Sequence, residues 1–121
     1  MKKLVLLITL LMFSVTVFAA DGMATRSFDV SKYTPNEVDF VKATISSMNI
    51  KGWEVDSYEK GKLTGNYKKK HVIEILFDGK KITINESSGS GGFRTSWIES
   101  LERLIINGLN MQYYIRQAEK N

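Results

Sequence analysis

Apolar residues follow three different patterns along the chain. Residues 4–18 form a continuous uncharged run, residues 38–48 carry apolar side chains at helical spacing, and residues 53–86 alternate between apolar and polar. From residue 97 onwards the helical spacing returns. Because helices repeat every 3.6 residues and strands every two, this order predicts a leader, a helix, a group of strands and a second helix.

The leader has the three parts of a secretory signal peptide. Lys2 and Lys3 precede the apolar run, and Ala19 and Ala20 follow it. The run is shorter than the roughly 20 residues that span a bilayer, although a retained membrane anchor is the alternative. We expect residues 1–20 to be removed, with cleavage after Ala19 or Ala20 and Ala19 favoured, and the protein to be periplasmic or, alternatively, secreted. Residues 21–32 are predicted to form a flexible arm and residues 33–121 a single α+β domain.

The first helix has several agreeing start signals. Thr34 is placed to cap it, Pro35 to occupy its first position and Glu37 to complete a capping box. Tyr33 and Val38 have the spacing of a hydrophobic staple. The residues expected on its inner face are Val38, Val41, Ile45 and Met48.

Turn residues divide the alternating stretch into four short strands. The strongest turn signal is Asp78-Gly79, which is typical of a tight hairpin. The predicted strands cover residues 53–57, 63–67, 71–77 and 80–86. They are expected to form a four-stranded antiparallel meander.

A second capping box, from Ser96 to Glu99, begins the last helix. The Asn107-Gly108 pair could end this helix, but we expect it to continue, with or without a kink, to residues 115–117. The resulting fold is α+β, in the order α-β-β-β-β-α, with both helices packed on one face of the sheet.

The third strand carries more apolar residues than one face can hold. Val72 and Leu76 point to one side, and Ile73, Ile75 and Phe77 to the other. Whichever set faces away from the helices would expose apolar surface, unless the C-terminal segment or a second copy of the protein covers it. Ile73, Ile75 and Phe77 are therefore the candidate interaction surface.

Charge and cysteine content narrow the classes of function. The chain has a formal charge of +4, and removing the leader with Lys2 and Lys3 leaves 4 − 2 = +2. This small surplus, together with export, argues against a nucleic-acid partner. The chain has no cysteine, so neither a disulfide nor a lipid anchor on a cysteine is available.

Lys68, Lys69, Lys70 and His71 form the candidate anion contact. Other lysines flank the remaining turns, but successive turns of a meander lie at opposite ends of a sheet. The lysines should therefore separate into two groups, and lysine-rich turns that keep the sheet soluble are the alternative interpretation.

The sequence offers no catalytic, cofactor or metal-binding constellation. His71 is the only histidine, and zinc needs three or four ligands. The glycine-rich loop at residues 87–92 lacks the lysine and hydroxyl of a phosphate-binding loop, and the acidic residues are scattered. Trp53 and Trp97 are expected in the core, with a groove shared with Tyr58, Tyr67 or Phe93 as the alternative.

The order of several short motifs resembles a family of small exported bacterial proteins and lipoproteins of unassigned function. The motifs are Gly52-Trp53, Gly61 with Leu63, His71 opening a strand that ends in Ile75-Leu76-Phe77, Ile82-Thr83-Ile84 before Glu86-Ser87, and Trp97-Ile98 with Leu101. The resemblance covers roughly residues 34–105. This chain departs from the family in lacking the lipidated cysteine and in having Phe93 and Arg94 where a tyrosine commonly precedes the helix tryptophan. The resemblance implies an exported α+β domain and brings no catalytic residues.

These observations favour a non-catalytic binding domain, not an enzyme, that works through the apolar back of its sheet or an exposed strand edge. Its partner would be another protein or a second copy. One alternative is a peripheral envelope protein that contacts anionic headgroups through its lysine-rich turns, and a less favoured one is an enzyme of unknown class.

Overall fold

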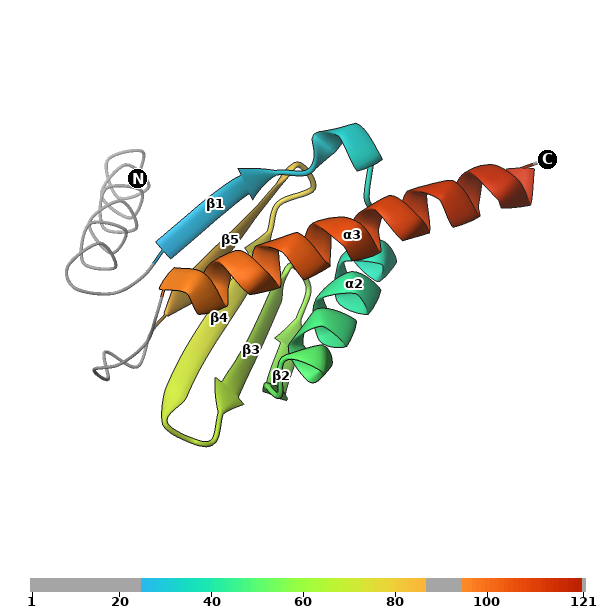
Figure 1. Cartoon of the computed structure of the whole chain (residues 1–121). Helices are drawn as coiled ribbons and strands as arrows, with labels where there is room; N and C mark the ends of the chain where they lie inside the picture. Colours follow the sequence, from blue (N-terminus) through green and yellow to red (C-terminus); the bar gives the residue numbers. More distant parts are fainter. Residues whose placement is uncertain (1–24, 87–94, 121) are drawn as a thin grey trace, which may run out of the picture.

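The computed structural model describes residues 25–86 and 95–120 and is α+β, as the sequence predicts. The elements in order are β1 (Thr25–Asp29), the short 3-10 helix η1 (Ser31–Tyr33), α2 (Glu37–Ile50), β2 (Glu54–Glu59), β3 (Lys62–Tyr67), β4 (His71–Phe77), β5 (Lys81–Glu86) and α3 (Thr95–Lys120). Figure 1 shows α2 and α3 in front of a single sheet. The predicted leader, residues 1–20, and the glycine-rich loop, residues 87–92, lie outside the described residues.

The sheet has five antiparallel strands in the order β1-β5-β4-β3-β2, so the prediction of four was wrong. The additional strand is β1, which lies in the segment predicted to be a flexible arm. It pairs with β5 over its whole length, from Thr25 opposite Asn85 to Asp29 opposite Lys81. Val30, directly after it, is fully buried and donates its backbone N–H to the carbonyl of Lys80 at 2.7 Å. Residues 25–30 are therefore part of the domain, and the prediction of a flexible arm was wrong for them.

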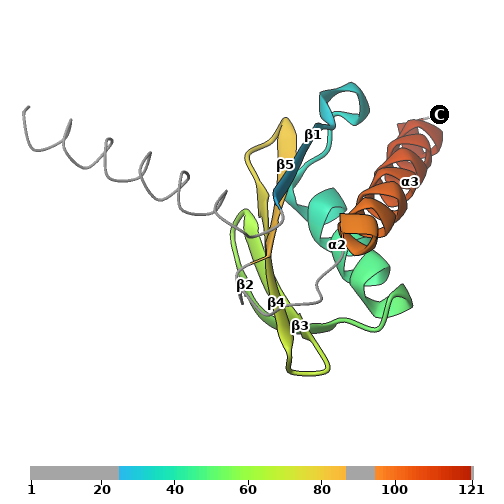
Figure 2. The ribbon, with the colours of Figure 1, turned by 60° about the vertical axis from the view of Figure 1, so that its left-hand side comes forward.

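Both helices pack on one face of the sheet, as Figure 2 shows with the sheet nearly edge-on. The inward side chains of the central strands have no exposed area: Leu63, Ile73, Ile75, Ile82 and Ile84. They meet buried residues of both helices, including Phe40, Met48, Leu101 and Ile105, in one continuous core. Burial of this apolar area is the main favourable contribution to folding.

The first helix begins two residues later than predicted. Asn36 is the N-cap, and its side chain accepts from the backbone of Asp39 while the Asp39 carboxylate accepts from the backbone of Asn36. Thr34 instead has a left-handed backbone, with φ of 41°, at the end of η1. The prediction of a capping box was therefore correct, but its residues were wrong.

The buried face of α2 also differs from the predicted stripe. Val38 is 57% exposed, whereas Phe40, Ala43 and Ser47 are buried. The helix touches α3 as well as the sheet, and small residues on its α3 side let the two helices approach closely. A pattern of large apolar residues alone does not reveal that second contact.

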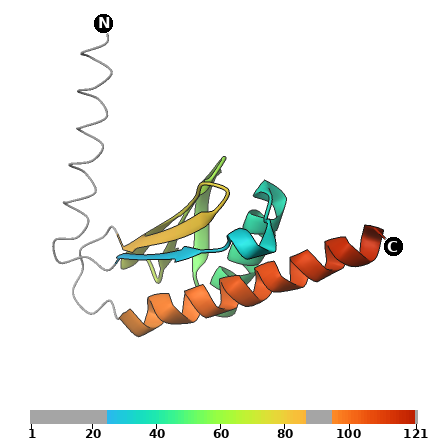
Figure 3. The same ribbon diagram turned by 90° about the horizontal axis from the view of Figure 1, so that it is seen from above.

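The last helix continues through Asn107-Gly108 without interruption, as expected. Its 26 residues correspond to about 39 Å at 1.5 Å per residue. Figure 3 shows its C-terminal part projecting beyond the sheet. There Arg116 forms an ion pair with Asp39 at 3.1 Å and donates to the backbone carbonyls of Tyr33 and Thr34. This contact fastens the projecting helix to α2 and η1.

Candidate functional site

The three residues predicted as an interaction surface lie beneath the helices. Ile73 and Ile75 are fully buried, and Phe77 stacks on Phe40 of α2 with ring centroids 4.9 Å apart. They face inward because both helices cover the side of β4 that carries the larger apolar set. The proposed contact surface on these residues was therefore wrong.

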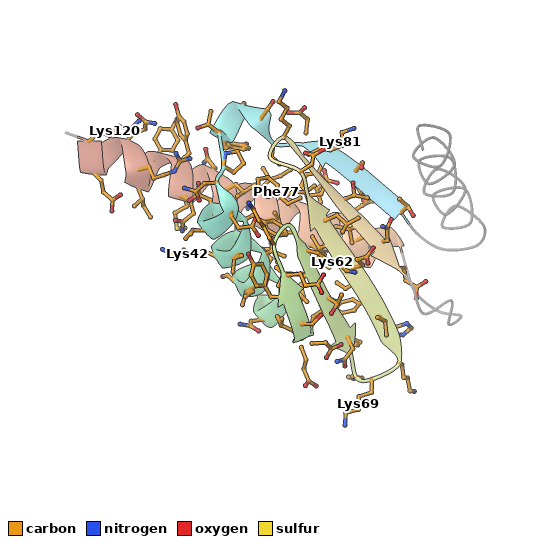
Figure 4. The ribbon with its side chains drawn as sticks, turned by 180° about the vertical axis from the view of Figure 1, so that it is seen from behind. Lys42, Lys62, Lys69, Phe77, Lys81 and Lys120 are labelled. Atoms are coloured by element: carbon orange, nitrogen blue, oxygen red, sulfur yellow. The ribbon has the colours of Figure 1, made fainter. Side chains whose placement is uncertain are left out.

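The opposite face of the sheet is mainly polar. Neighbouring strands join through side-chain hydroxyls, with Ser27 and Thr83 at 2.6 Å and Ser57 and Thr64 at 2.5 Å. Lys62 also lies on this face, which Figure 4 presents to the viewer, and pairs with Glu74 at 3.3 Å. The outward apolar residues of β4 are Val72, which is 36% exposed, and Leu76. This face is too polar to support the predicted apolar back of the sheet.

The predicted anion contact separates into two environments. Lys68, Lys69 and Lys70 are exposed at the tip of the β3–β4 hairpin, where Lys68 and Lys69 have positive φ angles. His71 is only 8% exposed, on the inner face, with its ring edge-on to Trp97 at 5.3 Å. The grouping of His71 with the lysines was therefore wrong.

The predicted separation of the lysines is confirmed. Figure 4 shows Lys69 at one end of the sheet and Lys81 at the other. The seven residues of β4 between the two turns span about 20 Å at 3.3 Å per residue. The two groups therefore cannot bind one small anion together.

Aromatic side chains meet where α2, β2, β3 and α3 come together. Tyr67 lies between the two tryptophans, with ring centroids 5.5 Å from Trp53 and 5.4 Å from Trp97. The rings are tilted by 51° and 53°, within the range that aromatic pairs favour. We call Trp53, Tyr67 and Trp97 the aromatic cluster.

Each residue of the aromatic cluster lies at or next to the end of a helix or strand. Gly52, which follows the C-cap Lys51 of α2, has φ of +83°, a conformation that glycine adopts without steric cost. The Trp53 backbone N–H then donates to the Met48 carbonyl at 2.8 Å, and Trp53 directly precedes β2. Tyr67 is the last residue of β3, and Trp97 lies in the first turn of α3.

The aromatic cluster lines a pocket of about 190 Å³, which we call the aromatic pocket. The described residues that line it are Lys51, Trp53, Tyr67, Trp97 and Ser100. Ligand sites for drug-sized molecules measure about 300–1,000 Å³, so this one suits a smaller molecule or a single side chain. Its lining residues combine aromatic rings with the Lys51 ammonium group and the hydroxyl groups of Tyr67 and Ser100.

The sequence only partly indicated this pocket. Trp53 is 4% exposed and belongs to the core, as predicted, while one edge of it reaches the pocket. Of the aromatic residues suggested for a groove, Tyr67 is present. Tyr58 lies elsewhere, and its hydroxyl donates to Glu37 at 2.6 Å, which raises the Tyr58 pKa. Phe93 lies outside the described residues. Lys51 and Ser100 carried no signal, since a lysine after a helix and a serine within one are common.

The described residues show no further ligand constellation. Within residues 25–86 and 95–120, no three histidine, aspartate or glutamate side chains come together as metal ligands do. Over the same ranges, no helix combines the length and the apolar character needed to cross a bilayer.

The fold and the aromatic pocket define a small α+β domain with a sheet covered on one side and a lysine beside clustered rings. Comparison with protein-family models, curated proteins and solved structures found no match. The resemblance to small exported bacterial proteins therefore stays a prediction.

Proposed function

We propose that this protein is a non-catalytic binding domain, acting after export, whose ligand enters the aromatic pocket. The observation that carries the proposal is the convergence of three aromatic rings on one concavity of about 190 Å³. Exposed edges of aromatic rings in a concave site are a common means of holding small molecules or side chains.

The surroundings of the aromatic pocket support a preformed site. Trp53 is buried and bonded to the end of α2, Tyr67 ends β3 and Trp97 lies in the first turn of α3, so little ordering is needed on binding. A preorganised site loses less conformational entropy when a ligand binds.

The chain offers a direct reporter for the test. Its only two tryptophans, Trp53 and Trp97, both line the aromatic pocket. Labelling with 5-fluorotryptophan therefore gives two fluorine NMR signals, both from this site. Titration with four probes, phenylacetate, phenylacetamide, benzylamine and cyclohexanol, is expected to shift at least one signal in a saturable way.

A pocket-filling variant checks where the probes bind. Ser100→Phe should abolish the shifts, because its ring would occupy the pocket that Ser100 lines. The matched control is Ser46→Phe, on an exposed position of α2, which should leave them unchanged. If no probe at millimolar concentration moves either signal, or if Ser100→Phe binds as the parent does, the proposal is wrong.

A second candidate function uses the hairpin tip formed by Lys68, Lys69 and Lys70. All three side chains are exposed there, which supports contact with anionic lipid headgroups. This function does not need the aromatic pocket, and its test is separate.

A further inference from the structure

The charged groups that line the aromatic pocket indicate the charge of the ligand it would bind. Among its described lining residues, Lys51 contributes an ammonium group and none contributes a carboxylate. Glu54, close in sequence, begins β2 opposite Asn66, so its side chain lies on the face of the sheet opposite to that of Tyr67.

Helix ends do not reverse this positive character. The pocket lies beside the C-terminus of α2, which carries partial negative charge, and the N-terminus of α3, which carries partial positive charge. These two partial charges are of similar size, about half an elementary charge each, and they oppose one another. Lys51 is the one formally charged side chain among the described lining residues.

A second ammonium group lies near the same rings. The Nζ atom of Lys68 is 5.3 Å from the centre of the Tyr67 ring, within the range of a cation–π contact. Lys51, after α2, and Lys68, after β3, therefore both lie near Tyr67.

We propose that the ligand of the aromatic pocket is a small carboxylate with an apolar or aromatic body, and that Lys51 binds its carboxylate group. The apolar body would contact the aromatic cluster, and the Ser100 hydroxyl is available to donate a hydrogen bond. Lys68 adds positive potential without lining the pocket. This inference rests on the proposed function but can fail without it.

Phenylacetate and phenylacetamide form the discriminating pair, since they share a ring and nearly the same shape and differ in charge. We expect phenylacetate to bind at least about fivefold more tightly, and raising the salt concentration to reduce that preference because the site is open to solvent. Affinities are measured from the two 5-fluorotryptophan signals.

Variants at Lys51 test the assigned residue. Lys51→Gln should weaken phenylacetate about fivefold and leave phenylacetamide unchanged, while Lys51→Arg should retain the preference. Lys60→Gln is the matched control, since it removes one charge in the β2–β3 turn at the other end of the sheet.

The outcomes separate the two proposals. Equal binding of acid and amide, or a preference that persists in Lys51→Gln, overturns the carboxylate inference while ligand binding stands. Stronger binding of benzylamine also overturns it. If none of the four probes binds, both proposals are wrong.

Discussion

Gly108 of α3 lies directly against Ala43 of α2. A β-carbon added at Gly108 would come within 2.9 Å of the Ala43 Cβ and 3.2 Å of its Cα. Neither atom can rotate away, because the Cα and Cβ atoms are fixed to the helix backbone and Ala43 is buried. The separation of the two helices is therefore set at this contact.

Gly108→Ala should destabilise the fold even though alanine favours helices. Alanine gains about 1 kcal/mol of helix propensity over glycine. Overpacking a core contact typically costs about 1–3 kcal/mol, so we expect a net loss of about 1 kcal/mol in the free energy of unfolding. Urea denaturation measures this difference.

Two further variants make this test specific. Asn107→Ala, on an exposed neighbouring position, should stabilise by a few tenths of a kcal/mol. Adding Ala43→Gly to Gly108→Ala should cost less than the sum of the single changes, since it restores the lost space. A Gly108→Ala variant as stable as the parent would show that the helices do not depend on this contact.

The strands in which apolar and polar residues alternate could be predicted from the sequence, whereas β1 could not. The inward positions of the three inner strands carry apolar or aromatic residues, except for Gly65 within β3 and the terminal positions His71 and Glu86. By contrast, β1 reads Thr-Arg-Ser-Phe-Asp and has one apolar residue, Phe28. Its place depends on pairing with β5 and on an ion pair between Arg26 and Glu102 of α3, both distant in sequence. The pattern of apolar and polar residues within β1 does not indicate such long-range contacts.

The start of α2 gives a prediction that distinguishes the observed cap from the one expected from sequence. Asn36→Ala should cost about 1 kcal/mol, because it removes the acceptor for the Asp39 backbone. Thr34→Ala should change stability by less than about 0.5 kcal/mol, since Thr34 makes no capping bond to α2. Thermal or urea unfolding compares the two, and a larger loss for Thr34→Ala would contradict the observed cap.

The candidate site was less predictable than the fold, because it joins residues from four elements. Period-2 alternation identified Ile73, Ile75 and Phe77 as one set but could not show which face the helices cover. The aromatic pocket requires Lys51, Tyr67 and Ser100 to come together, and their separations along the chain give no indication that they do. Such a concavity depends on how helix ends meet strand ends.

Acid should reduce the contribution of Asp78 to stability. The backbone N–H groups of Lys80 and Lys81 donate to its carboxylate at 2.9 and 2.8 Å, and these bonds lower the Asp78 pKa. A lowered pKa stabilises the fold above the ordinary aspartate pKa of about 3.9, and this contribution disappears as the pH falls through the folded value. Asp78→Asn should therefore be less stable than the parent at pH 7, by under about 1 kcal/mol for so exposed a group.

The measurement for Asp78 is urea unfolding at pH 7 and at pH 2.5. The difference between Asp78→Asn and the parent should shrink in acid. Glu119→Gln, an exposed charge change on α3, serves as control. A difference that stays constant or grows in acid would contradict the hydrogen-bonding role.

Headgroup binding, the second candidate function, predicts that position matters as much as charge. Replacing Lys68, Lys69 and Lys70 by glutamine removes three exposed charges from one tip, and each basic residue near an anionic surface contributes about 1 kcal/mol. Replacing Lys60, Lys80 and Lys81 removes the same charge from the opposite end of the sheet. In sedimentation with vesicles of phosphatidylglycerol and phosphatidylcholine at low salt, only the first variant should lose binding, and salt should weaken the parent. Equal losses of binding in both variants would indicate attraction to the overall charge of the protein. No binding by the parent would exclude the headgroup function. Neither result would affect the proposal that a ligand binds in the aromatic pocket.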